Sequence, residues 1–217
     1  DLAVWRAMAT RDGGETLGPD RFLSAANRYQ LMPTIDRWVI EHALAQLQPH
    51  AATIAATNVV FAINCSGQSL TDTEFADELI ARIEASGLPP QSLCFELTES
   101  ATIANLARAE VLMRRLRKLG CGVALDDFGT GLSSLAYLRQ LPVSMLKIDG
   151  SFVRDILRDP RSDSLVQAVA QLARTMQMLT VAEYVETDAI RERIAALGVD
   201  YGQGFALTII VPEGNDT

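Results

Sequence analysis

The chain has 217 residues, of which 48% are hydrophobic and 21% charged, and its formal net charge is −8. This composition excludes extensive disorder, and the length fits one large α/β domain. The negative charge argues against a DNA- or RNA-binding protein, because a sequence-independent grip on nucleic acid requires a basic face. The sequence has no apolar run of about 18 residues and no basic, signal-peptide-like start, so we expect no membrane segment.

The chain contains three cysteines. Cys65, Cys94 and Cys121 each lie inside an apolar, strand-like run. An odd number of cysteines in such positions favours buried free thiols in a reducing compartment over a disulfide framework. We therefore expect a cytoplasmic protein.

Short apolar runs alternate with amphipathic segments along the chain. Strands are expected at residues 58–64, 92–99, 122–129, 144–149, 179–186 and 198–207. Helical spacing predicts helices over Phe22–Tyr29, Asp36–Leu47, Thr73–Glu84, Ile103–Leu119, Leu135–Arg139, Ser164–Met176 and Thr187–Leu197. This alternation predicts βα units and a parallel sheet. Because no Pro/Ser-rich linker marks a boundary, we interpret residues 1–217 as a single domain.

Each expected strand ends in residues that are costly to bury. These are Asn64, Glu96 with Glu99, Asp126 with Asp127, Lys147 with Asp149, Glu183 with Glu186, and Gln203. In a parallel barrel the C-terminal strand ends meet on one face, where active sites of such folds lie. One polar strand end indicates only contact with solvent. Six polar strand ends in series, dominated by carboxylates, predict a functional site at the mouth of the barrel.

The residue types at this mouth indicate a particular chemistry. Asn, Asp and Glu offer hard oxygen ligands, which suit Mg²⁺ or Mn²⁺. Asp126 and Asp127 repel each other and need a positive partner, and an adjacent pair can bridge two ions that cleave a phosphodiester in line. Lys147 either orients or deprotonates the attacking water or stands in for a cation as a salt-bridge partner.

Longer segments carry a resemblance to a known family. FELTES, ALDDFGTGLSSLAYLRQLPVSMLKID, VAEYVET and GQGFA are similar to signature segments of the EAL-domain family, the cyclic-di-GMP phosphodiesterases and their receptor relatives. IDRWVI and Asn64-Cys65-Ser66 extend the likeness, which runs from Phe22 to Phe205. The resemblance implies an α/β fold, a TIM-like (β/α)8 barrel that binds cyclic di-GMP on its C-terminal face. In active members two Mg²⁺ or Mn²⁺ ions support hydrolysis to pGpG.

The resemblance also implies roles for individual residues. Metal ligands are expected at Asn64, Glu96, Asp126, Asp127 and Glu183. The catalytic set of an active member would be Lys147, Glu183, Gln203 and Asp149. Glu99 resembles the glutamate that holds the loop 128–134, a loop implicated in dimerisation and regulation of the family. Ligand contacts are expected at Arg6, Ser66, Asp126, Glu183, Tyr184, Gln203 and Phe205.

Several positions depart from the family pattern. Where the Glu-Ala-Leu motif belongs, the sequence has Leu2-Ala3-Val4, and a shift by one residue places Asp1 at the glutamate. The ending LTIIVP (207–212) replaces a polar-Lys-Pro ending, and the first barrel strand is missing from the sequence.

Two residues near these departures have alternative interpretations. Tyr184 stands where the family has glycine, and its ring either stacks on a guanine or packs against protein. Arg6 either pairs with a phosphate or is an exposed arginine near a chain end. Both alternatives stay open for each residue.

These departures leave two functions open. A degenerate member, similar to the FimX type IV pilus regulators, would be a cyclic-di-GMP receptor with weak or no phosphodiesterase activity. A working member would be a Mg²⁺- or Mn²⁺-dependent phosphodiesterase. The sequence favours the receptor, because loss of one ligand can abolish catalysis and leave the pocket intact. A module that binds no nucleotide fits poorly with so many retained polar strand ends.

The partners follow from the same resemblance. EAL domains usually follow sensory or cyclase-like domains, so we expect the C-terminal domain of a larger multidomain signalling protein. The expected ligand is cyclic di-GMP. A PilZ-domain adaptor protein and a second copy of the chain, in a homodimer, are the expected protein partners.

Overall fold

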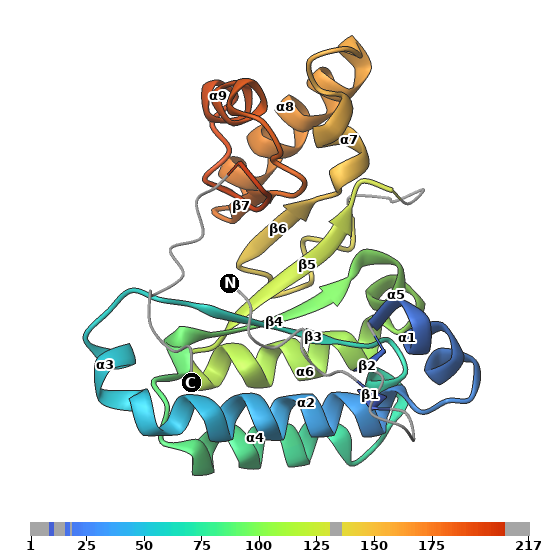
Figure 1. The fold of residues 1–217 in the computed structure, drawn as a ribbon, viewed down its shortest axis with the longest axis vertical. Coiled ribbons are helices and arrows are strands. Elements are labelled where there is room, and N and C mark those ends of the chain that lie inside the picture. Colours follow the sequence, from blue (N-terminus) through green and yellow to red (C-terminus); the bar gives the residue numbers. More distant parts are fainter. Residues whose placement is uncertain (1–8, 11–15, 18, 131–135, 207–217) are drawn as a thin grey trace. The chain divides into compact units, whose positions relative to one another are not determined.

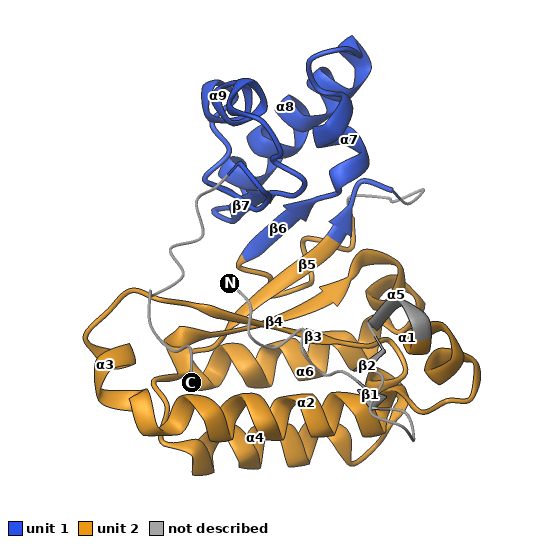
Figure 2. Cartoon of the chain, in the orientation of Figure 1, with its two compact units in different colours: residues 1, 127–130, 145–217 blue, residues 2–126, 131–144 orange. Residues whose placement is uncertain are grey.

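The computed structural model describes residues 9–10, 16–17, 19–130 and 136–206 (Figure 1). These residues divide into two compact units (Figure 2). Unit 1 contains residues 127–130 and 145–206, and unit 2 contains the other described residues. Strand β5 (Gly122–Phe128) begins in unit 2, and its last two residues belong to unit 1.

Unit 2 is built on parallel strands. Strands β3 (Phe61–Cys65), β4 (Leu93–Thr98) and β5 pair in parallel, with Phe61 opposite Leu93 and Cys94 opposite Gly122. The helices α2 (Met32–Leu47), α4 (Phe75–Ser86) and α6 (Leu106–Leu119) lie along one side of these strands (Figure 1).

The remaining elements of unit 2 are short. They are β1 (Ala9–Thr10), β2 (Thr16–Leu17), α1 (Pro19–Arg28), η2 (Gln48–His50), α3 (Ala51–Ala55), η3 (Ser69–Thr71), η4 (Pro90–Ser92) and α5 (Glu99–Ala104). Strands β1 and β2 pair with each other in antiparallel fashion.

The core of unit 2 explains the apolar runs in the sequence. Ile63, Phe95, Leu97, Val123 and Leu125 are fully buried in strands β3, β4 and β5. Parallel strands covered on both faces have near-continuous apolar sequences of this kind. Polar residues in these runs are therefore confined to the strand ends.

Unit 1 repeats the same plan. Strand β6 (Met145–Ile148) pairs in parallel with β7 (Leu179–Ala182), and β7 pairs in parallel with β8 (Tyr201–Gly202). Its helices are α7 (Gly150–Asp155), α8 (Pro160–Thr175) and α9 (Asp188–Ala196). Asp159 caps the start of α8 by accepting from the Arg161 amide, and Thr187 caps α9 by accepting from the Ile190 amide.

The structure has a parallel strand in each predicted range, but β8 covers only two residues of 198–207, β7 ends at Ala182, and β1 and β2 were not anticipated. Several helices are also corrected. The helix predicted over Leu135–Arg139 is wrong: residues 136–140 form turns, with the Gln140 amide bonded to the Tyr137 carbonyl. This apolar run is too short for a stable helix and is followed by Pro142. The helix predicted over Ile103–Leu119 is broken at Asn105, and α3 and α7 were not anticipated.

Two other expectations concern cysteines and membranes. Cys65, Cys94 and Cys121 are buried and none of them forms a disulfide, as predicted. Burial raises the pKa of Cys121 to about 11, so this thiol is protonated at neutral pH. Among the described residues, no helix combines the length and the apolar character needed to cross a membrane.

A buried carboxylate links helix α2 to the segment that follows β3. Asp36 on α2 accepts hydrogen bonds from the Ser66 amide (2.8 Å) and the Ser69 hydroxyl (2.6 Å). Burial raises the pKa of Asp36, and the bonds from Ser69 and Ser66 oppose this rise. Asp36 therefore fixes the polar end of β3 against the core of unit 2.

The substitution Asp36→Ala should lower the free energy of unfolding by about 2–3 kcal/mol, because it leaves the Ser66 amide and the Ser69 hydroxyl without their acceptor. Denaturant unfolding at neutral pH measures the effect. The exposed Glu84 on α4 provides a control, and Glu84→Ala should change stability by less than about 0.5 kcal/mol. Equal effects of the two substitutions would contradict the role of Asp36.

Candidate functional site

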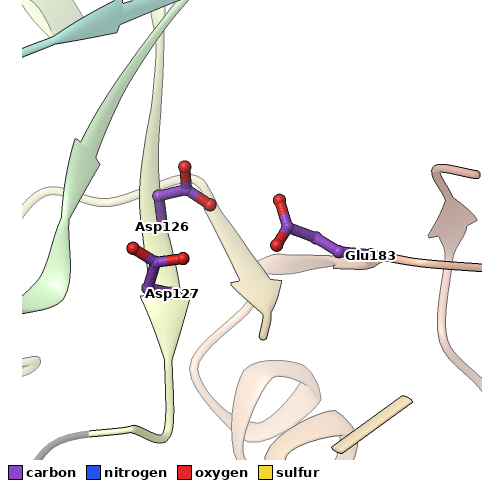
Figure 3. Close-up of side chains that lie close together, drawn as sticks. All are labelled: Asp126, Asp127 and Glu183. Atoms are coloured by element: carbon purple, nitrogen blue, oxygen red, sulfur yellow. The ribbon is translucent and has the colours of Figure 1, made fainter. Parts of the chain in front are cut away.

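The end of strand β5 brings two carboxylates together. In a regular strand, adjacent side chains point to opposite faces. Asp127, however, has a left-handed backbone with φ 55°, which breaks this alternation. Asp and Asn adopt this conformation more readily than most residues. Figure 3 shows that the carboxylates of Asp126 and Asp127 consequently lie close together, although the two residues are neighbours in the strand.

A third carboxylate belongs to the same group. Glu183 follows strand β7, and its amide donates to the Ile148 carbonyl at 3.2 Å, which continues the pairing with β6. One carboxylate oxygen from each of Asp126, Asp127 and Glu183 lies within 4.8 Å of the others (Figure 3). All three side chains are partly exposed.

A buried lysine faces Glu183. Lys147 lies on β6, and its Nζ is 2.8 Å from Oε1 of Glu183. The side chains are 6% and 17% exposed, respectively, so this ion pair is weakly screened by solvent. Lys147 therefore forms a salt bridge, which is one of the two roles that the sequence allowed for it. The salt bridge places the positive charge of Lys147 beside the carboxylates of Asp126, Asp127 and Glu183.

The group combines three carboxylates with one lysine. Three carboxylates carry three negative charges, and Lys147 supplies one positive charge at Glu183. Repulsion between carboxylates at this separation costs on the order of 1–3 kcal/mol for each pair, with partial exposure reducing the cost. Oxygen donors arranged in this way fit a hard divalent cation.

Two further predicted ligands lie side by side in unit 2. Asn64 on β3 is opposite Glu96 on β4, and Glu96 is opposite Ala124 on β5. Paired residues of parallel strands point to the same face, and so do residues two apart in one strand. Asn64, Glu96 and Asp126 therefore share a face. Glu96 is 6% exposed, so its carboxylate lies in a weakly solvated position. Ser66 follows β3 and is held by Asp36 through its amide.

Glu99 is the first residue of α5 and is 1% exposed. Its carboxylate accepts a hydrogen bond from the hydroxyl of Tyr137, which is also buried. Tyr137 was not singled out from the sequence, because nothing in an apolar segment distinguishes this tyrosine from a core residue. The pair ties the start of α5 to the segment that follows residue 135.

The other predicted residues of unit 1 occupy the ends of β6 and β8. Asp149 caps α7 by accepting from the Ser151 amide at 2.9 Å and from the Ser151 hydroxyl. Gln203 follows β8, and its backbone amide donates to the Ala182 carbonyl at 2.8 Å. Its side chain is exposed, and the Phe205 side chain is 89% exposed.

Tyr184 directly follows Glu183 and is half exposed, so its ring is not fully buried, and stacking on a guanine stays a prediction. The guanidinium of Arg154 lies over its ring, 4.7 Å from the centroid. Arg154 was not anticipated as part of this region, because α7 was not predicted.

Some of the predicted features lie outside the described residues. These are Arg6, the segment Asp1–Val4, residues 131–134 of the loop and residues 207–212.

Comparison with known proteins identifies the family. The model of the EAL domain family matches residues 3–208. Cyclic di-GMP phosphodiesterase PdeF of Escherichia coli (strain K12) is 39% identical over 196 residues, which are 90% of this chain and 26% of PdeF. Cyclic di-GMP phosphodiesterase PdeB of Shewanella oneidensis is 38% identical over 194 residues, which are 89% of this chain and 22% of PdeB. The chain thus spans about a quarter of the length of these relatives.

Solved structures show the same fold. The EAL domain of FimX from Pseudomonas aeruginosa, bound to c-di-GMP, is 29% identical with a TM-score of 0.81, covering 92% of this chain and 79% of that chain. The PaMucR phosphodiesterase in its c-di-GMP complex is 32% identical with a TM-score of 0.85, covering 95% of this chain and 83% of that chain. These similarities confirm the predicted α/β fold of the TIM-like EAL barrel.

The substitution Asp127→Asn tests whether the carboxylates form a cation site, because asparagine keeps the shape and tolerates the left-handed backbone. Added Mn²⁺ should raise the melting temperature of the wild type and have less effect on the variant.

Asp155→Asn is the matched control for this experiment, because it makes the same charge change at an exposed position of α7. Its response to Mn²⁺ should equal that of the wild type. An equal Mn²⁺ response in Asp127→Asn would contradict a cation site at the end of β5.

Proposed function

The chain belongs to the EAL domain family, and from this premise we propose that it binds cyclic di-GMP and hydrolyses it to the linear dinucleotide in the presence of Mg²⁺ or Mn²⁺. The relatives PdeF and PdeB are named cyclic di-GMP phosphodiesterases, which supports the substrate. Two similar structures contain c-di-GMP, which supports the ligand.

The observation that carries the proposal is the group of Asp126, Asp127 and Glu183 beside Lys147. A pocket that only recognises a dianionic ligand gains nothing from three carboxylates, because they repel its phosphates. The same carboxylates suit a site that first binds divalent cations. Hydrolysis therefore explains their retention better than binding alone does.

The protein residues would act as follows. Asn64, Glu96, Asp126, Asp127 and Glu183 would hold the cations, with Asp149 serving the second one. Bound cations would supply Lewis-acid stabilisation of the phosphate and a water that loses its proton near neutral pH. Lys147 would hold the attacking water and place positive charge where the phosphate becomes more negative. Gln203 would orient the same water.

Other residues would recognise the nucleotide. Arg6, Ser66 and Phe205 are the proposed contacts to phosphates and bases, together with Asp126, Glu183 and Gln203. Arginine can pair with a phosphate through two hydrogen bonds. The buried bond between Glu99 and Tyr137 would hold the loop after β5 in place.

The setting of the domain is also a proposal. Residues 1–217 would act as one EAL domain, the C-terminal domain of a larger cytoplasmic signalling protein. A PilZ-domain adaptor and a second copy of the chain are its proposed protein partners.

A second candidate function is a receptor that binds cyclic di-GMP with weak or no hydrolysis. The observation that favours it is the sequence Asp1-Leu2-Ala3-Val4, which has leucine where the family motif has a metal-binding glutamate. A ligand displaced by about one ångström costs on the order of a hundredfold in rate. If no other residue takes this place, binding would survive and turnover would not.

Lys147→Met should lower kcat for hydrolysis of cyclic di-GMP by about 10²–10³-fold, because it removes the positive charge beside the reacting phosphate. Chromatography of pGpG with Mg²⁺ or Mn²⁺ measures the rate, and calorimetry of ligand binding shows whether the variant is folded. The exposed Lys118 on α6 provides the control, and Lys118→Met should behave as the wild type.

Two outcomes decide between the candidates. Metal-dependent pGpG formation by the wild type, lost in Lys147→Met, supports the phosphodiesterase. Tight binding without product at any metal concentration contradicts hydrolysis and supports the receptor.

A further inference from the structure

The segment that carries Glu183 contains an unfavourable backbone conformation. Tyr184 has φ 55°, in the left-handed region that favours glycine. For a residue with a bulky side chain, this conformation is costly. Something in the fold must therefore hold the tyrosine there.

Hydrogen bonds on both sides of Tyr184 impose this conformation. The Glu183 amide donates to the Ile148 carbonyl on β6 at 3.2 Å. The Val185 amide donates to the Gln203 carbonyl at 3.0 Å. The backbone thus bonds to Ile148 on β6 at Glu183 and to Gln203 after β8 at Val185. Because only Tyr184 lies between these two bonds, the backbone turns at Tyr184.

The Tyr184 ring packs against the first turn of α7. A Cβ atom at Gly150 would lie 2.0 Å from Cδ2 of the ring, so only glycine leaves room for it. The guanidinium of Arg154, one turn further along α7, lies 4.7 Å from the ring centroid. The ring is therefore held by a glycine at its edge and by a cation over its face.

These contacts connect two parts of the proposed site. Gly150 directly follows Asp149, which caps α7, and Tyr184 directly follows Glu183, which pairs with Lys147. The ring thus joins the start of α7 to the segment after β7. The ring makes this connection through its contact with Gly150 and through the guanidinium of Arg154 over its face.

We infer that Tyr184 is a positioning residue: its ring, lodged between Gly150 and Arg154, fixes the carboxylate of Glu183 opposite Lys147 so that it can hold a divalent cation. This inference rests on the proposed function, because it assigns Tyr184 a role at the same site. It also accounts for a bulky residue at a backbone position that favours glycine.

The substitution Tyr184→Gly separates positioning from stability. Glycine relieves the left-handed strain but loses the ring contacts and makes the unfolded chain more flexible, so the melting temperature should stay within about 3 °C of the wild type. The Mn²⁺ dissociation constant, measured on the full chain by electron paramagnetic resonance, should rise about 10–100-fold. Tyr184→Phe keeps the ring and should restore the wild-type constant.

Gln177→Gly is the matched control. Gln177 also has a left-handed backbone, with φ 58°, and lies exposed after α8. The substitution makes the same backbone change away from the carboxylates, so the Mn²⁺ dissociation constant should not change. If Tyr184→Gly, like Gln177→Gly, leaves the Mn²⁺ dissociation constant unchanged, the inference is wrong.

A double-mutant cycle tests the packing partner. Gly150→Ala in the wild type should displace the Tyr184 ring and weaken Mn²⁺ binding by about as much as Tyr184→Gly does. In the Tyr184→Gly background, Gly150→Ala should have no further effect. Additive effects of the two substitutions would contradict the inferred contact.

Kinetics distinguish positioning from contact with the nucleotide. A positioning residue should lower kcat in Tyr184→Gly and leave KM for cyclic di-GMP within about threefold. A ring that stacks on a base should instead raise KM, and that result would overturn the inference.

The inference and the proposed hydrolysis can fail separately. If the wild type binds Mn²⁺ but forms no pGpG, the proposed hydrolysis fails, and the Mn²⁺ dissociation constants of the variants still decide the role of Tyr184. A wild type that binds no Mn²⁺ contradicts both.

Discussion

Repulsion between the adjacent carboxylates of Asp126 and Asp127 is the constraint from which the rest of the site follows. A strand as buried as β5 would be more stable with an apolar end, since like charges close together are unfavourable. The left-handed backbone at Asp127 increases the difficulty, because it turns the second carboxylate toward the first instead of away from it. Glu183 adds a third negative charge. An arrangement of this kind needs positive charge nearby, and Lys147 lies 2.8 Å from Glu183.

The fold supplies the rigidity that this arrangement requires. Within unit 2, fully buried side chains such as Phe95 and Leu125 fix the register of the strands and thereby place Asn64 opposite Glu96. Within unit 1, hydrogen bonds from the Glu183 and Val185 amides hold the segment after β7 on both sides. Left-handed residues occur at both carboxylate-bearing segments, at Asp127 and at Tyr184. Strained backbone of this kind persists only where the surrounding structure enforces it.

Much of the fold could be predicted from the sequence because its strands are continuous apolar runs with polar ends. Leu93–Thr98 and Gly122–Phe128 follow this rule closely, and the same rule identified Glu96, Asp126 and Asp127. Short helices were harder, because few residues give little periodicity. Helix α7, with six residues, was missed, and the turns at residues 136–140 were mistaken for a helix.

The contacts that complete the site could not be predicted. The Tyr137 hydroxyl bonds to Glu99 across 38 positions of sequence, and Arg154 reaches the Tyr184 ring from a different element. Both contacts depend on tertiary packing, and neither leaves a local pattern. The sequence could show that Tyr184 departs from the family glycine, but not that its backbone keeps the conformation of a glycine. The space for its ring depends on Gly150, 34 positions earlier, which has no apparent link to it in the sequence.

The proposed hydrolysis depends on a divalent cation bound by the carboxylates of Asp126, Asp127 and Glu183. A crystal of the protein grown with Mn²⁺, measured at the manganese absorption edge, tests it most directly. We expect an anomalous peak in contact with carboxylate oxygens of Asp126, Asp127 and Glu183. A well-ordered site without such a peak at saturating Mn²⁺ would contradict a cation site at the end of β5.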